Sequence, residues 1–118
     1  MAYLIAAQYG NDAFKGMLDD PQNREPRIRH FFSSAGLEVE KVGFSVATGE
    51  IFVWVEGTKA QIGAVEFTAM ATGAFAAISI TELISSEEML QLMKAAASLK
   101  DTYQPPNQDE IDRMLLDE

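Results

Sequence analysis

The order of apolar patterns along the chain predicts four strands, three main helices and one short helical piece. Apolar runs typical of strands occupy residues 2–9, 37–46, 51–56 and 74–84. Apolar residues at helical spacing occupy residues 24–35, 58–71 and 85–99, with a shorter helical segment at 13–18. This order predicts an α+β fold, the ferredoxin-like βαββαβ arrangement with an antiparallel four-stranded sheet and an extra C-terminal helix.

The second predicted strand contains a break in its apolar alternation. Leu37 and Val39 share one phase, and the apolar positions then continue at Val42. The odd step between 39 and 42 predicts a β-bulge near Glu40–Lys41. The following strand, 51–56, is apolar on both faces, which is typical of a central strand that is covered on both sides.

The helices carry recognisable start signals and apolar stripes. Thr58 is placed to cap the helix 58–71, and Ser85 with Glu88 has the spacing of a capping box. Helix 58–71 is expected to bury its apolar stripe, Ile62, Val65, Ala69 and Met70. Three methionines on such stripes are expected to fill the core, namely Met70, Met89 and Met93.

In a sheet of this type the two main helices cover only one face. The other face would then carry aromatic and aliphatic side chains, and a contiguous exposed apolar patch usually marks an interface. Two copies can bury such faces against each other around a twofold axis. The pattern therefore predicts a homodimer.

Composition narrows the classes of function. The chain has 118 residues, no cysteine, one histidine and a net charge of −9, which excludes a thiolate metal site and disfavours nucleic acid as a partner. The apolar stretches are too short to span a membrane, and the N-terminus lacks a signal-peptide pattern. We therefore expect a cytoplasmic protein that binds neither nucleic acid nor membrane and holds no metal or other cofactor.

The negative charge is concentrated at the C-terminus. Residues 101–118 hold six acidic residues and one arginine, a net charge of −5, whereas residues 1–100 carry the remaining −4. Pro105–Pro106 breaks any helix that precedes it, and beyond it Ile111, Met114 and Leu115 form one apolar stripe. We expect a ferredoxin-like domain at 1–100 and an acidic linker with a short helix at 101–118. That helix could dock on its own subunit, on the dimer partner or on another protein.

Several features are spread over residues 1–95, namely the strand Tyr3-Leu4-Ile5, the step Pro21–Arg24 into a helix, Gly36, the turn Thr48-Gly49-Glu50 and the run from Thr72-Gly73 to Thr81-Glu82-Leu83. Together they resemble the GYD-domain family of the dimeric α+β barrel superfamily and imply the dimeric α+β barrel as the fold. Gly49 matches the glycine of the family's motif, but Glu50 and Ile51 stand where that motif has tyrosine and aspartate. The resemblance implies a dimer of this fold with a site between sheet and helices. Relatives in the superfamily include cofactor-free oxygenases, isomerases and ligand-binding proteins.

The polar candidates for a site are few. At about 100° per residue, His30 lies about 200° from Ile28, so it is expected to face away from the core and is a poor metal ligand. Arg24, Arg27 and Arg29 cluster beside it and form either an anion site or a solvated helix start.

The remaining candidates suggest two kinds of site. An apolar or aromatic molecule, such as a fatty acid, could be bound by Tyr3, Tyr9, Phe52, Trp54 and Met70. Alternatively, a cofactor-free monooxygenase or isomerase would need a buried acid–base group, for which the candidates are Glu50 and Tyr9. A third hypothesis is a protein-interaction module that uses the acidic tail.

Overall fold

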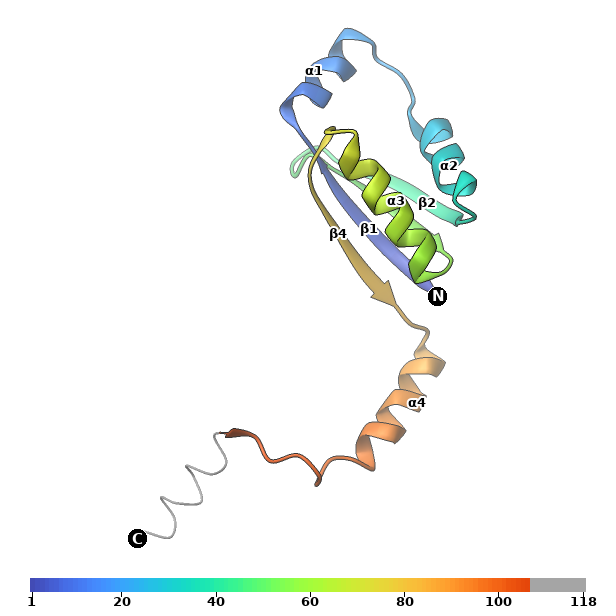
Figure 1. The fold of residues 1–118 in the computed structure, drawn as a ribbon, viewed down its shortest axis with the longest axis vertical. Coiled ribbons are helices and arrows are strands. Elements are labelled where there is room, and N and C mark those ends of the chain that lie inside the picture. Colours follow the sequence, from blue (N-terminus) through green and yellow to red (C-terminus); the bar gives the residue numbers. More distant parts are fainter. Residues whose placement is uncertain (107–118) are drawn as a thin grey trace, which may run out of the picture. The chain divides into compact units, whose positions relative to one another are not determined.

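The computed structural model describes residues 1–106 and divides the chain into two compact units, Met1–Leu83 and Ile84–Glu118 (Figure 1). The short helix predicted from Ile111, Met114 and Leu115 lies outside the described residues. The domain boundary that the sequence places after residue 100 stays a prediction, as does the interaction role of the tail. Among residues 1–106, no helix has the length and apolar character that a membrane crossing requires.

The first unit is built on one antiparallel four-stranded sheet. Its strands are β1 (Ala2–Tyr9), β2 (Glu38–Ser45), β3 (Glu50–Glu56) and β4 (Phe75–Leu83), and they lie in the order β2-β3-β1-β4. The helices between them are α1 (Asn11–Asp19), α2 (Glu25–Ser34) and α3 (Lys59–Ala71). This topology is the ferredoxin-like βαββαβ fold with α1 as an addition, as the sequence predicts.

Two irregularities in strand pairing shape the sheet. The register of β2 against β3 shifts between Val39 and Lys41, which confirms the predicted bulge. A second shift lies between Gln8 and Tyr9 at the end of β1, so that Tyr9 pairs with Phe75. Such a bulge bends a strand and re-aims its side chains. Tyr9 is therefore presented at the end of the sheet near α1.

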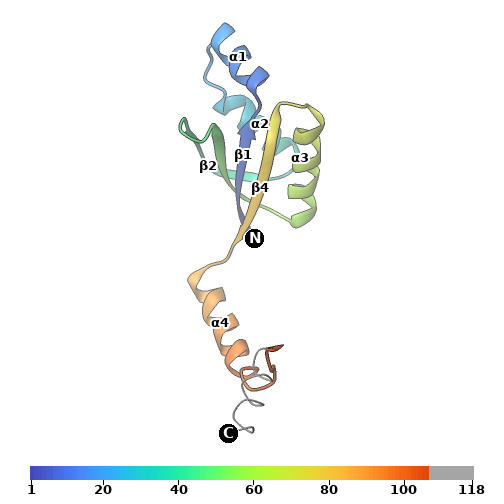
Figure 2. The ribbon, with the colours of Figure 1, turned by 90° about the vertical axis from the view of Figure 1, so that its left-hand side faces the viewer.

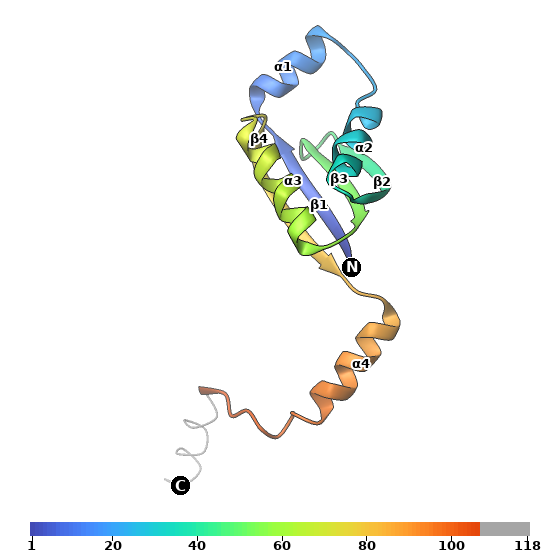
Figure 3. The ribbon, with the colours of Figure 1, turned by 45° about the vertical axis from the view of Figure 1, so that its right-hand side comes forward.

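Helices α2 and α3 pack on the same face of the sheet (Figures 1 and 3). Figure 2 shows α3 lying along the edge strand β4. The core under these helices combines alternate positions of β1 and β3 with three helical side chains, Phe32, Ile62 and Val65. The start of α3 is fixed by a complete capping box, in which Thr58 Oγ1 accepts from the Gln61 amide at 3.2 Å and Gln61 Oε1 accepts from the Thr58 amide at 2.8 Å.

Helix α1 is held against the β2–β3 turn through one aromatic contact. Gly49 in that turn has a φ of +69°, a conformation that favours glycine. The ring of Phe14 approaches so closely that a Cβ atom on Gly49 would lie 2.9 Å from it. The same ring meets the edge of Tyr9, with ring centroids 6.0 Å apart. Gly49 thus lets α1 close over one end of the sheet.

Neither α2 nor α3 packs on the opposite face of the sheet, which we call the open face. Strand alternation places Leu4 of β1 and Phe52 and Trp54 of β3 on this face, because their neighbours Ile5, Val53 and Val55 are in the core. Trp54 remains 40% exposed. The sequence predicted that both faces of β3 are covered. Within this unit, only the face toward the helices is covered.

In the second unit, α4 (Ser86–Ala97) forms the extra C-terminal helix. Ser85 caps it by accepting from the Glu88 amide at 3.1 Å, and its hydroxyl lies 3.4 Å from Glu88 Oε1. The methionine prediction is wrong for Met70, which is 50% exposed on α3, whereas for Met89 and Met93 on α4 it stays a prediction. On α3 the buried side chains are Ile62 and Val65, so Met70 points beyond the buried stripe.

Candidate functional site

A cavity of about 250 Å³ lies between the sheet and the helices α2 and α3. Its floor consists of helix-facing strand residues, namely Ile5, Ala7, Ile51, Val53, Ile78 and Ile80. Its walls come from the two helices, with Ile28, Phe31 and Phe32 on α2 and Val65 and Ala69 on α3. The same alternation that builds the core thus leaves an apolar space in the middle of it.

Four polar side chains reach this cavity, and two of them are already engaged. The Thr68 hydroxyl donates to the Ala64 carbonyl at 2.8 Å, and the Thr72 hydroxyl donates to the Ala69 carbonyl at 2.6 Å. Tyr9 and Glu66 are the other two. Within residues 1–106, neither of these two side chains makes a hydrogen bond or ion pair with another residue. They are therefore the polar side chains on the cavity wall that have no protein partner in that range, although polar atoms form almost none of the cavity surface.

Tyr9 lies at the end of the cavity, where its ring stacks on Phe75 with centroids 4.9 Å apart. Burial raises the pKa of the Tyr9 phenol above its ordinary value of 10.0, and the nearby positive charge of Arg24 offsets part of this rise. The phenol is therefore neutral at physiological pH and can donate a hydrogen bond.

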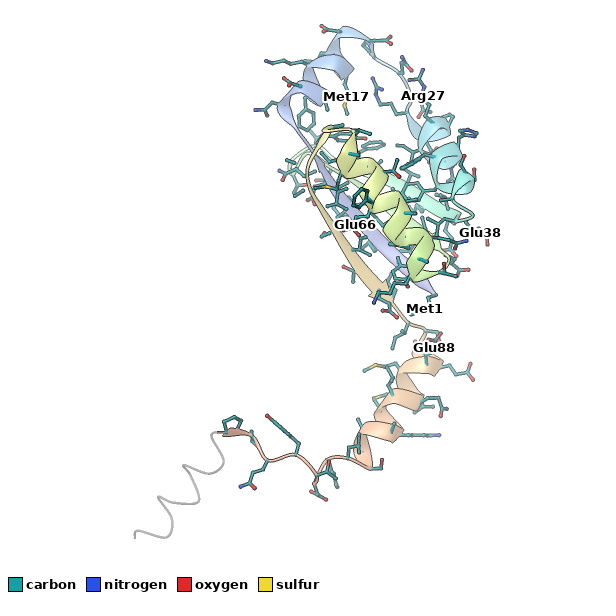
Figure 4. The ribbon with its side chains drawn as sticks, viewed as in Figure 1. Met1, Met17, Arg27, Glu38, Glu66 and Glu88 are labelled. Atoms are coloured by element: carbon teal, nitrogen blue, oxygen red, sulfur yellow. The ribbon has the colours of Figure 1, made fainter. Side chains whose placement is uncertain are left out.

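A second, more open space of about 630 Å³ adjoins the cavity, and we call it the outer cleft. It lies among α1, the loop that follows α1 and the start of α2, where Figure 4 labels Met17 and Arg27. The side chains that line both spaces are Tyr9, Ile28, Phe31, Thr72 and Phe75. The cavity and the outer cleft are therefore neighbouring spaces, with Tyr9 on the wall of both.

The arginine cluster divides into two parts. Arg29 turns away from the cleft, because its guanidinium donates to the Val39 carbonyl at 3.0 Å and lies 3.6 Å from the Glu25 carboxylate. Arg24 and Arg27 line the outer cleft instead. Arg24 donates a long hydrogen bond of 3.4 Å to the Asp20 carbonyl. Two of the three arginines are thus available at the mouth of the cavity.

The structure brings only one of the predicted site residues to the cavity. Tyr9 lines it, but Tyr3 is 3% exposed within the core and is not part of the cavity wall. Phe52, Trp54 and Glu50 share the open face, because they alternate with Ile51 and Val53 on β3. Met70 does not line the cavity either.

Sequence reasoning missed the residues that matter most at the cavity, Glu66, Phe31 and Phe75. No local sequence signal points to these three residues. The alternation along β3 does not choose between its two faces either, because the pairing of β3 with β1 decides that Ile51 and Val53 face the helices. His30 is exposed, as predicted. No group of three or more side chains suited to holding a metal ion occurs in the part of the chain that the structure describes.

The chain matches no known family model, and no curated protein matches it. Among solved structures it is similar to the 5-chloro-2-hydroxyhydroquinone dehydrochlorinase of Burkholderia phenoliruptrix, solved in complex with 2,5-dihydroxybenzoquinone. The identity is 13% and the TM-score 0.47, over 75% of this chain and 98% of that one. Likeness at this level concerns overall α+β architecture and carries no argument about function. The resemblance to the GYD-domain family stays a prediction.

Proposed function

We propose that the first unit binds an apolar or aromatic small molecule in the cavity between the sheet and the helices α2 and α3. The observation that carries this proposal is the cavity itself, about 250 Å³ of space lined almost wholly by aliphatic and aromatic side chains. An apolar cavity of about 150 Å³ already admits benzene, and ligand pockets begin at about 300 Å³. The space therefore suits a ring system or a medium-length chain, with the outer cleft receiving any part that projects.

A direct test is to titrate the full chain with naphthalene and with octanol and to follow the melting temperature and the heat of binding. We expect saturable binding that is weakened at least tenfold by Ala69→Leu, which adds bulk to the cavity wall. Ala64→Leu is the matched control, because it lies exposed on the same helix and does not line the cavity. Absence of binding by both probes, or equal loss in both variants, would contradict the proposal.

We further propose that two copies of the chain associate through the open face. Support comes from Trp54, 40% exposed at the centre of a sheet, with the apolar side chains of Leu4 and Phe52 beside it. Small residues on the same face, Gly43 and Ala6, pair with Phe52 and would allow close approach. Light scattering of the full chain tests this: Trp54→Lys should convert a dimer to a monomer, whereas Lys59→Glu on α3 should leave the dimer intact. A monomeric wild-type chain would refute it.

A second candidate function is acid–base chemistry on the bound molecule. Glu50, the acid named from the sequence, faces away from the cavity, so the candidates become Tyr9 and Glu66, which both line it. A carboxylate could take a proton from a substrate while a neutral phenol stabilises the resulting charge. Catalysed exchange of an acidic carbon-bound proton of a cavity ligand with solvent deuterium would support this function. Its persistence at full rate in Glu66→Gln would contradict it.

A further inference from the structure

The outer cleft and the cavity wall carry side chains of opposite charge. The described charged residues that line the cleft are Asp20, Arg24 and Arg27, which together carry a net positive charge. The Asp20 carboxylate already accepts a hydrogen bond from Gln22, and the Asp20 carbonyl accepts from Arg24. Arg27 has no hydrogen bond or ion pair to any residue in the range 1–106. Guanidinium donors in the cleft are thus in excess over the carboxylate that could neutralise them.

The charged side chain on the cavity wall is acidic. Glu66 of α3 lines the cavity but not the outer cleft, whereas Arg24 and Arg27 line the cleft but not the cavity. A bound anionic group is therefore repelled from the Glu66 side and attracted toward the arginines. Tyr9 lines both spaces, and burial raises the pKa of its phenol, so that its hydroxyl is neutral at physiological pH.

The size and polarity of these two spaces define one kind of ligand. An apolar body fits the cavity, and a single negatively charged group at one end would lie at the arginines, where guanidinium pairs with carboxylate through two parallel hydrogen bonds. Conversely, a neutral apolar ligand would leave the Arg27 guanidinium without a partner among residues 1–106 and would add none to the single long hydrogen bond of Arg24.

Building on the binding function proposed above, we propose that the natural ligand is a monocarboxylic acid. Its alkyl or aryl body occupies the cavity, and its carboxylate lies in the outer cleft against Arg24 and Arg27. The Tyr9 hydroxyl donates to the same carboxylate. This arrangement fixes the orientation of the ligand, with the apolar end toward α3 and the acidic end toward α1.

The test compares acids with their neutral amides, which have nearly the same shape. Octanoate is compared with octanamide, and naphthoate with naphthamide, by calorimetric titration of the full chain at low ionic strength. We expect at least one acid to bind at least tenfold tighter than its amide, since hydrogen bonds to charged groups exceed neutral ones. Raised salt should reduce this preference. The pair with the larger preference shows whether the body is an alkyl chain or an aromatic ring.

Three arginine variants locate the preference. Arg27→Gln should reduce acid binding about tenfold and leave amide binding unchanged, and Arg24→Gln combined with it should abolish the preference. Arg29→Gln is the matched control on the same helix, because its guanidinium is directed to Val39 and Glu25, and it should retain the preference.

Two results would separate the failure of this inference from that of the binding function. If acids and amides bind equally, or if the double variant keeps the preference, the carboxylate assignment is overturned while the cavity still binds. If neither acids nor amides bind, and Ala69→Leu changes nothing, the binding function itself fails.

Discussion

Replacing Ala69 by leucine should stabilise the first unit rather than disrupt it. Ala69 lies on α3 and lines the cavity, so a larger side chain has space to enter. Leucine and alanine have similar helix propensities, so the backbone of α3 is not penalised. In a fully packed core the same change would be overpacking, which costs about 1–3 kcal/mol. The sign of the effect therefore reports whether the space is empty.

The magnitude follows from the three carbon atoms that the substitution adds. Each buried methylene contributes about 0.8 kcal/mol, or about 2.4 kcal/mol for three. Ordering a leucine side chain costs about 0.5–1 kcal/mol, and Ala69 is only half-buried, so part of the new surface stays in water. We expect a net gain of about 1 kcal/mol, equivalent to about 4–8 °C in melting temperature for a unit of this size.

Urea denaturation and calorimetric melting of the wild type, Ala69→Leu and the Ala64→Leu control measure this gain. The control should stay within about 0.5 kcal/mol of the wild type, as surface substitutions usually do. A ligand at 100 times its dissociation constant stabilises the wild type by about 2.7 kcal/mol, and the Ala69→Leu variant should lose most of that response. A destabilised Ala69→Leu variant would refute the existence of an empty apolar cavity.

Four further substitutions test the structure around the site. Burial raises the pKa of Tyr9, so the neutral phenol contributes its full share to the free energy of unfolding below pH 10.0 and loses that share as pH rises through the folded pKa. Tyr9→Phe should remove this alkaline loss of stability, which urea denaturation at rising pH would measure. Gly49→Ala should destabilise by about 1–2 kcal/mol, because φ is +69° and Phe14 blocks the new Cβ. The same change at Gly63, in open space on α3, should stabilise by about 0.5–1 kcal/mol in thermal melts. Thr58→Ala should cost about 1 kcal/mol by removing the cap of α3.

The fold could be predicted because local signals agreed with one another. The break in apolar alternation between Val39 and Val42 predicted the bulge, and the register of β2 against β3 shifts there. Thr58 and Ser85 marked the starts of α3 and α4. These features depend on neighbouring residues alone, so a single sequence contains them. The boundaries of the strands then follow from turns that glycines such as Gly49 form.

The candidate site could not be predicted with the same success, because it depends on contacts between distant segments. Aromatic character singled out Phe52 and Trp54, but only the pairing of β3 with β1 decides which parity faces the helices. The relevant aromatic rings, Phe31 and Phe75, come from α2 and from the strand end beside a register shift. Glu66 falls on a helix flank and carries no local signal of a cavity.

Because alternate residues of β3 face opposite sides, ligand binding and dimer formation should be separable. Ile51 and Val53 line the cavity, whereas Phe52 and Trp54 belong to the open face. Trp54→Lys should therefore change the oligomeric state while leaving the affinity for a cavity ligand within about twofold, as calorimetric titration at dilute protein would show. In the double variant with Ala69→Leu, the change in the free energy of unfolding should equal the sum of the two single changes to within about 0.5 kcal/mol, since the two side chains lie on opposite faces of the sheet.

A larger interaction between Trp54 and Ala69 would mean that the sheet transmits strain from one face to the other. The floor of the cavity would then deform when the partner copy leaves. Ligand affinity would depend on protein concentration in the wild type, because dimerisation and binding would be linked equilibria. Measuring the affinity above and below the dimer dissociation constant distinguishes these cases, and a constant value supports two independent faces built on one strand.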